Sequence, residues 1–233
     1  MNYFHDLFDD LLSLLFPRLC YGCGNHLLRN EKLLCTECYV MIPRATYHLE
    51  RGNPVEQLFW GRCRIERAAA FSFYNRDSRI RKVIHNLKYK GIQEIGIELG
   101  RIYGNILNAS EFLDDIDLIV PVPLHISKRR ARGFNQSDLI SRGLSEVTGL
   151  PVDYRSLQRI TKTATQTKRS RYERWVNVEG IFTVADPEGI RGKHVLLVDD
   201  VITTGSTIES CANELLKSEG VKVSVVAIAV AVT

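Results

Sequence analysis

The fold is decided by the stretch His194-Val-Leu-Leu-Val-Asp-Asp-Val-Ile-Thr-Thr-Gly-Ser-Thr207. Residues 195–198 form an aliphatic run that is too short for a helix and has no polar alternation, which is typical of a parallel strand buried on both faces. Asp199 and Asp200 follow this run directly, so we expect them at the carboxyl end of a strand, where open α/β sheets bind their ligands. The sequence therefore predicts an α/β protein whose functional site lies at the end of this strand.

A run of small and hydroxylated residues follows the two acids: Thr203, Thr204, Gly205, Ser206 and Thr207. This run, called the anion loop below, supplies hydroxyls, free backbone N–H groups and a glycine that tolerates positive φ, directly before an amphipathic helix. Such an arrangement binds anions at a helix N-terminus. Because carboxylates repel phosphates, the acids and the anion loop together indicate a ligand with both a phosphate and hydroxyl donors, such as a sugar phosphate.

The stretch resembles the phosphoribosyl pyrophosphate (PRPP) signature of the type I phosphoribosyltransferases. The resemblance implies that Asp199 and Asp200 hold the 2- and 3-hydroxyls of the ribose, and that Thr203 to Thr207 hold the 5-phosphate. A Walker B strand also ends in acids, but the chain has no G-x-x-x-x-G-K-[ST] phosphate loop. A second alternative is that the two acids are ordinary solvent-exposed residues at a strand end. That interpretation does not explain the Thr-Thr-Gly-Ser-Thr sequence that follows them.

A second buried strand is expected at residues 116–122, and Pro121 and Pro123 force the chain to leave the sheet there. Cations followed by a helix predict a second anion site at this second strand end. In phosphoribosyltransferases the loop at this position binds pyrophosphate. The residues assigned to it form the basic segment His125, Lys128, Arg129, Arg130 and Arg132.

Pro121-Val-Pro-Leu124 and Arg132-Gly-Phe-Asn-Gln136 narrow the resemblance to the ComF family of bacterial competence proteins, which join an N-terminal zinc ribbon to a phosphoribosyltransferase-type domain. The resemblance runs from Cys20 to a final strand near residues 221–232. It implies a type I phosphoribosyltransferase fold, that is, an open parallel sheet flanked by helices, with Mg²⁺ bound alongside PRPP. It also implies a hood loop containing Lys162, Thr163, Gln166 and Arg174.

Four cysteines form two C-x-x-C pairs, and this spacing predicts a structural Zn²⁺ site. Two disulfides are the alternative, but they need an oxidising compartment, and nothing in the sequence directs export. Two further cysteines, Cys63 and Cys211, are single and are expected to be buried as small apolar side chains. The predicted metal ligands are Cys20, Cys23, Cys35 and Cys38.

The chain has 233 residues, of which 45% are hydrophobic and 25% charged, as in ordinary soluble globular proteins. We expect a cytoplasmic protein. Asp6, Asp9 and Asp10 interrupt the apolar N-terminus, which argues against a signal peptide or a membrane span. We expect an amphipathic helix at residues 1–16, a zinc ribbon at 17–50, a linker at 51–66 and a phosphoribosyltransferase-type domain at 67–233. Within that domain, we expect a strand at 68–74 and helices at about 78–89 and 95–108.

Positive charge is concentrated in residues 121–174, which contain twelve Lys or Arg and four Asp or Glu, whereas the whole chain carries a net charge of +4. This pattern indicates a polyanionic partner, either PRPP alone or also single-stranded DNA, with Phe134, Tyr172 and Trp175 as candidate stacking groups. A solvated basic surface is the alternative. The cations of the helix expected at 78–89, including Lys88, are interpreted as a solvated face.

These features predict a ComF-type, PRPP-binding protein that handles DNA during its uptake in natural transformation, with competence proteins and single-stranded DNA as candidate partners. An orotate phosphoribosyltransferase is the alternative enzyme, but its hood motif is not found in this chain. A non-catalytic regulator that senses PRPP is the third possibility. The sequence assigns no catalytic residue, no acceptor and no oligomeric state.

Overall fold

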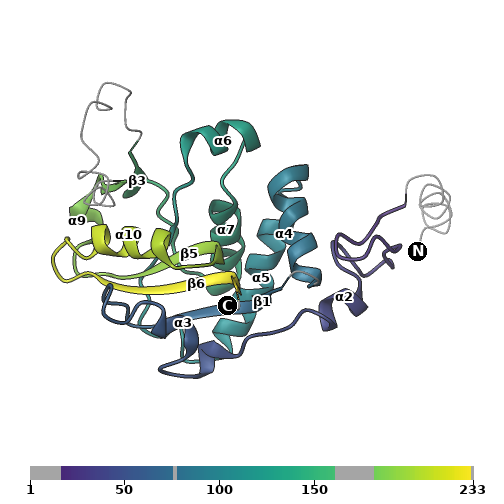
Figure 1. Ribbon diagram of the computed structural model, residues 1–233, viewed down its shortest axis with the longest axis horizontal. Coiled ribbons are helices and arrows are strands. Elements are labelled where there is room, and N and C mark those ends of the chain that lie inside the picture. The colour runs from purple at the N-terminus through teal and green to yellow at the C-terminus, as the bar shows by residue number, and fades with distance from the viewer. Residues whose placement is uncertain (1–16, 76–77, 161–180, 232–233) are drawn as a thin grey trace.

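The computed structural model describes residues 17–75, 78–160 and 181–231. Its main body is a parallel sheet of four strands in the order β1-β6-β5-β2 (Figure 1). A separate two-stranded antiparallel sheet pairs β3 with β4. The strands are β1 (Ala68–Tyr74), β2 (Leu118–Pro121), β3 (Leu157–Arg159), β4 (Phe182–Val184), β5 (His194–Ile202) and β6 (Lys222–Ala231).

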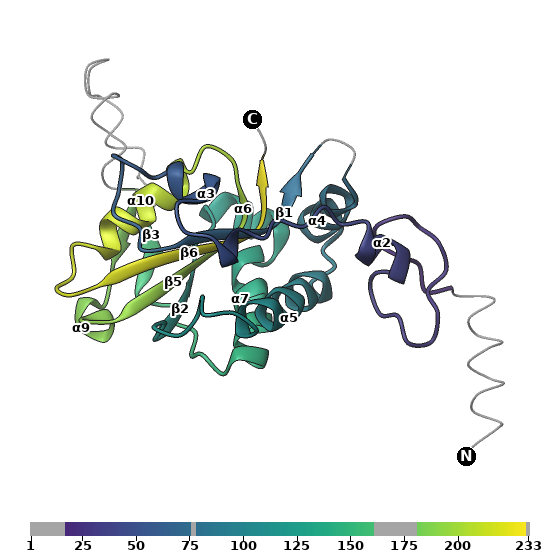
Figure 2. The same ribbon diagram turned by 90° about the horizontal axis from the view of Figure 1, so that it is seen from below.

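Helices cover both faces of the main sheet, with α3 and α10 on one side and α5 and α7 on the other (Figure 2). Leu196 and Val198 of β5 pack with α4, α5 and α7, whereas Val195 and Leu197 pack with α3 and α10. Burial on both faces explains why the strand has no polar alternation. The helices are α2 (Thr36–Val40), the 3₁₀ helix η1 (Tyr47–Leu49), α3 (Pro54–Gln57), α4 (Arg79–Lys90), α5 (Glu94–Asn108), α6 (Ile126–Arg132), α7 (Gln136–Thr148), α9 (Pro187–Ile190) and α10 (Ser206–Leu215).

The connections of the sheet diverge between β2 and β5. From β2 the chain passes through α6 and α7 to Val152, which forms a parallel bridge with Ile119 on the outer side of β2. From β5 it passes through α10 to β6, on the opposite side. In open α/β sheets, ligands bind in the crevice outside the carboxyl ends of two strands that diverge in this way.

Helices α5 and α7 cross at very short range, and this contact fixes the position of α7 relative to the sheet. A Cβ atom added at Gly143 would lie 2.0 Å from the carbonyl oxygen of Ile97, and one added at Gly100 would lie 2.2 Å from that of Ile140. Only glycine allows the two backbones to approach so closely. The N-terminal end of α7 is thereby held beside the carboxyl ends of β2 and β5.

The sequence predictions of β1, α4, α5, α7 and β6 are confirmed, and the parallel sheet flanked by helices is the type I phosphoribosyltransferase fold predicted above. The strand predicted to end before the acids is longer. It pairs with β6 as far as Ile202, because β6 extends beyond the point where β2 stops at Pro121. Asp199 and Asp200 therefore lie on a part of β5 that has β6 on one side and no paired strand on the other.

The interpretation of residues 51–66 as a linker needs correction. Val55 and Phe59 are each only 1% exposed and belong to the hydrophobic cluster that also contains Ile208 and Leu215 of α10. Asn53 caps α3 and donates to the carbonyl oxygen of Ala68 at 2.9 Å. Turn residues punctuate this segment as the composition suggested, but its apolar side chains cover one face of the sheet.

Residues 17–41 lie beside α4 and α5 at one end of the molecule (Figures 1 and 2). Residues 43–49 run along β1 instead: the backbone N–H of Ala45 donates to the carbonyl oxygen of Phe71 at 3.0 Å, and that of Phe73 donates to the carbonyl oxygen of Pro43 at 2.9 Å. Within the described ranges, no helix is both long enough and apolar enough to cross a lipid bilayer. The helix predicted at residues 1–16 lies outside the described residues.

Candidate functional site

Asp199 and Asp200 lie on β5 directly beyond the last residue paired with β2. The Ser137 hydroxyl, on the first turn of α7, donates to Oδ1 of Asp199 at 3.1 Å, and the backbone N–H of Asp200 donates to the same oxygen at 2.8 Å. Burial, reinforced by the charge of Asp200, raises the pKa of Asp199 to about 7. Asp199 therefore becomes a fully charged acceptor only above neutral pH.

Lys88 on α4 forms an ion pair with Asp200, and 2.8 Å separates its Nζ from Oδ1 of the acid. Both side chains are largely buried, with 21% and 13% exposed respectively. The interpretation of Lys88 as part of a solvated face is therefore wrong, although its neighbours Tyr89 and Lys90 are exposed. A ligand hydroxyl that binds Asp200 must share this carboxylate with Lys88.

The anion loop connects β5 to α10 as predicted. Gly205 is the N-cap of α10 and has a φ of +76°, a conformation that glycine adopts without strain. The hydroxyls of Thr204 and Ser206 lie 2.9 Å apart, and the side chains of Thr203 and Thr207 are exposed. Together with Asp199, the loop lines a hollow of about 40 Å³.

Two residues of the segment expected to be a linker, Phe59 and Arg62, contact the anion loop. A Cβ atom added at Gly205 would lie 3.0 Å from Cε1 of Phe59, so the ring fills the space under the glycine. Arg62 donates from Nη1 to the carbonyl oxygen of Thr204 at 2.9 Å and forms an ion pair with Glu209 on α10. Sequence analysis missed both residues, because no motif connects them to a loop more than 140 positions away.

The basic segment forms a short helix, α6, where an irregular loop was expected. Its side chains Lys128, Arg129 and Arg130 are exposed. Arg132 is less exposed: its Nη1 donates to Oε1 of Gln136 at 2.8 Å, and its guanidinium lies 5.4 Å from the ring centroid of Tyr89. The N-cap of α6 is His125, whose Nδ1 accepts from the backbone N–H of Ser127 at 3.2 Å.

The structure therefore brings the acids, the anion loop and α7 together at one edge of the sheet, and α6 follows the neighbouring strand. Phe134, a candidate stacking group, is half-buried and packs against the core. The remaining predicted contacts lie outside the described residues, namely the hood-loop residues Lys162, Thr163, Gln166 and Arg174 and the candidate stacking residues Tyr172 and Trp175.

The four cysteines of the two C-x-x-C pairs form one cluster, in which all four Sγ atoms lie within 4.8 Å of one another. Although burial opposes ionisation, backbone N–H groups, led by that of Cys35, lower the pKa of Cys20 to about 7. A Cβ atom at Gly22 would lie 2.8 Å from Sγ of Cys38, so the chain is closely wrapped around the sulfurs. This donor set fits a structural metal ion such as zinc.

The two single cysteines differ from this cluster. Cys211 is fully buried among the apolar residues between α10 and the sheet, as expected. Cys63 is half-buried, and burial raises the pKa of its thiol to about 11, so it is a poor nucleophile at neutral pH.

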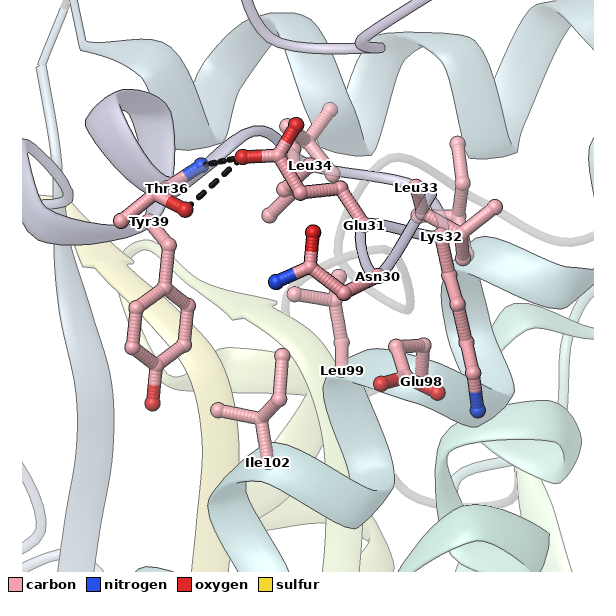
Figure 3. A pocket seen from close by; sticks show the side chains of 12 residues that line it. Asn30, Glu31, Lys32, Leu33, Leu34, Thr36, Tyr39, Glu98, Leu99 and Ile102 are labelled. Atoms are coloured by element: carbon pink, nitrogen blue, oxygen red, sulfur yellow. Dashed lines mark hydrogen bonds between the residues drawn. The ribbon is translucent and has the colours of Figure 1, made fainter. Parts of the chain in front are cut away.

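A cavity of about 350 Å³ lies between the cysteine cluster's module and helices α4 and α5 (Figure 3). In this view Glu31 points to Thr36, whose backbone N–H and hydroxyl both donate to Oε1 of the acid, at 2.6 and 2.8 Å. Leu99 and Ile102 of α5 form the apolar floor. None of the residues at the carboxyl ends of β2 and β5 lines this cavity, so it is separate from the site described above.

A family model and three curated relatives match this chain. A model of the phosphoribosyl transferase domain matches residues 138–233, which include most of α7 and all of β5, the anion loop and β6. The chain is 32% identical over 223 residues to the DNA utilization protein YhgH of Salmonella typhimurium, covering 91% of this chain and 96% of that protein. It is 37% identical over 107 residues to competence protein F of Haemophilus influenzae, with 46% of each chain covered. It is 26% identical over 212 residues to competence protein ComFC of Bacillus subtilis, covering 88% and 82% of the two chains.

Proposed function

Because the chain belongs to the ComF family, whose phosphoribosyltransferase-domain proteins are linked to DNA utilization and competence, we propose that it binds PRPP with Mg²⁺ at the carboxyl ends of β2 and β5. The observation that carries this proposal is that two carboxylates, Asp199 and Asp200, lie on β5 and that the anion loop follows this strand directly. Hydroxyl donors and a phosphate on the same molecule fit both features at once.

In this proposal each group of residues has a separate task. Asp199 and Asp200 accept hydrogen bonds from the ribose hydroxyls, while the hydroxyls and backbone N–H groups of residues 203–207 hold the 5-phosphate. Cations of the basic segment, His125 to Arg132, neutralise the pyrophosphate. Mg²⁺ bound to the pyrophosphate would lower its negative charge further. Four thiolates hold one structural Zn²⁺ in the N-terminal module.

Binding of PRPP does not require turnover, and three roles remain to be separated by experiment. Release of pyrophosphate from labelled PRPP in the presence of orotate or a purine base would indicate a metabolic transferase. Release that depends on single-stranded DNA would indicate an acceptor connected with DNA handling. Binding without release under all these conditions would indicate a PRPP sensor.

Replacing Asp200 by asparagine tests the ribose contact. The variant keeps the size of the side chain but removes a charged acceptor, and charge-assisted hydrogen bonds contribute roughly 1.5–3 kcal/mol each. We expect the affinity for PRPP to fall by about one to two decades. Titration calorimetry with Mg²⁺, at a pH of about 8 where Asp199 is ionised, measures the change.

Pyrophosphate is the control ligand for this titration, because it has no hydroxyl pair. Its affinity should stay the same or rise slightly in Asp200→Asn, since a repelling charge is lost. Asp199→Asn, measured in parallel, should also weaken PRPP more than pyrophosphate. If both variants bind PRPP as tightly as the wild type does, these acids do not contact the ribose.

We further propose that the chain binds single-stranded DNA through the exposed cations of α6. The favouring observation is that Lys128, Arg129 and Arg130 all project into solvent from a helix at the carboxyl end of the sheet. Reversing the charge at Arg129 and Arg130 should weaken binding and reduce the dependence of affinity on salt concentration. Fluorescence anisotropy of a labelled oligonucleotide at several salt concentrations measures both effects.

The matched control reverses two exposed cations outside α6, Lys32 in the cysteine module (residues 17–41) and Lys222 at the amino end of β6. This double variant has the same net charge, so it reveals any effect of net charge alone. A control variant that loses as much affinity as the α6 variant would exclude α6 as the DNA-binding surface. An affinity that does not change with salt would exclude an electrostatic surface altogether.

A further inference from the structure

Tyr89, near the end of α4, is an exposed aromatic ring held by two neighbours. Its side chain is 68% exposed. The ring centroid lies 4.6 Å from that of His85, one helical turn earlier, and 5.4 Å from the guanidinium carbon of Arg132. The His85 contact alone is an ordinary pair within a helix. Arg132, however, comes from α6, so the ring is oriented by two separate elements.

The ring lies beside the site proposed for PRPP. Its chain neighbour Lys88 forms the ion pair with Asp200, and Arg132 belongs to the basic segment that follows β2. Figure 1 shows α4 and α6 next to each other at this side of the molecule. Tyr89 thus connects the two strand ends at which the proposed function is placed, and the inference below rests on that function.

The surroundings of the ring select the class of ligand. Lys90, Arg129 and Arg130 are exposed close to it in the chain or on the adjoining helix, and they favour an anion over an apolar protein surface. A phosphate alone would not need an aromatic ring. An unpaired nucleobase attached to phosphates needs both, because its flat face stacks on aromatic side chains while cations contact the backbone.

We propose that Tyr89 is a stacking platform for an unpaired nucleobase of a single strand whose phosphates lie along α6. Arg132 of α6 and His85 of α4 orient the ring, and 68% of the Tyr89 side chain stays exposed for the base. The same chemistry could be presented by a free nucleotide, so the test includes both sources. The platform gives the protein a means of placing a base next to PRPP, which a purely electrostatic surface does not provide.

The test compares two labelled oligonucleotides of equal length with the full-length protein, one of thymidylates and one of abasic residues. Stacking on an aromatic side chain contributes enough for Tyr89→Leu to lower the affinity for the thymidylate strand by about five- to 150-fold. Affinity for the abasic strand should not change, and Tyr89→Phe should bind both strands like the wild type. Tyr154→Leu is the matched control, since Tyr154 is also an exposed tyrosine, at 51%.

Thymidine monophosphate, added as a competitor, separates the two sources of the base. If thymidine monophosphate displaces the thymidylate oligonucleotide only at concentrations far above that of the oligonucleotide, the result supports a single strand as the ligand. If it displaces the oligonucleotide at equal concentration, the ligand is a free nucleotide and the inference is overturned. The inference is overturned as well if Tyr89→Leu weakens both oligonucleotides equally, weakens neither, or if the wild type binds neither. Titration of Tyr89→Leu with PRPP tests the two proposals separately. If the stacking inference is overturned but the variant still binds PRPP, the proposed PRPP site is not affected.

Discussion

Replacing Cys35 by serine should release the metal ion and unfold the cysteine module, residues 17–41, while the main sheet stays folded. The hydrophobic cluster of this module consists mainly of the cysteines themselves, with Leu27 and Leu34 packed against them. So small a core cannot fold a module alone, and the free energy of binding structural zinc, roughly 10–16 kcal/mol in small modules, is then the free energy of folding. A serine hydroxyl does not replace a thiolate ligand.

Elemental analysis should find about one zinc per chain in the wild type and almost none in Cys35→Ser. Limited proteolysis of the variant should then cut within residues 17–41 and spare the sheet. Cys63→Ser is the control, because Cys63 is half-buried and lies outside the cluster; it should keep both the metal and the resistance to protease. Wild-type protein that contains no zinc and has all four sulfurs oxidised would show that the cluster is not a metal site.

Replacing Gly205 by valine should abolish measurable PRPP binding at ordinary concentrations. A β-branched residue at a φ of +76° is strained, and its Cβ would already lie within 3.0 Å of the Phe59 ring. The loop must therefore move, which misplaces the hydroxyls and N–H groups of Ser206 and Thr207. Losing two charge-assisted hydrogen bonds of roughly 1.5–3 kcal/mol each lowers affinity by about a hundredfold or more.

Gly149→Val separates this effect from backbone strain. Gly149 has nearly the same φ, +75°, but no atom lies within 4 Å of its added Cβ, and it follows α7 at the end remote from the acids. Both variants should lose stability by roughly 1–2 kcal/mol through strain alone. Only Gly205→Val should lose PRPP in calorimetry. Equal PRPP affinities in the two variants would remove the anion loop from the proposed site.

Local patterns in the sequence were sufficient for the elements of the fold and for much of the site. The aliphatic run at 195–198 predicted a strand buried on both faces, and the two core clusters on either side of β5 confirm it. The pair of C-x-x-C motifs predicted a cluster of four sulfurs, which the structure contains. Both succeed because the determining residues are close in the chain, where period and spacing directly constrain geometry.

Tertiary structure alone decided which distant residues complete the site. Lys88 reaches Asp200 across 112 positions, and Arg62 reaches the Thr204 carbonyl across 142. Tyr89 contacts Arg132 only because α4 and α6, which follow the two outer strands β1 and β2, both lie at the carboxyl end of the parallel sheet. The hydrophobic periodicity of a helix predicts on which face of the helix a side chain lies, but it does not predict which loop packs against that face. That depends on strand order and helix packing, which no local pattern records.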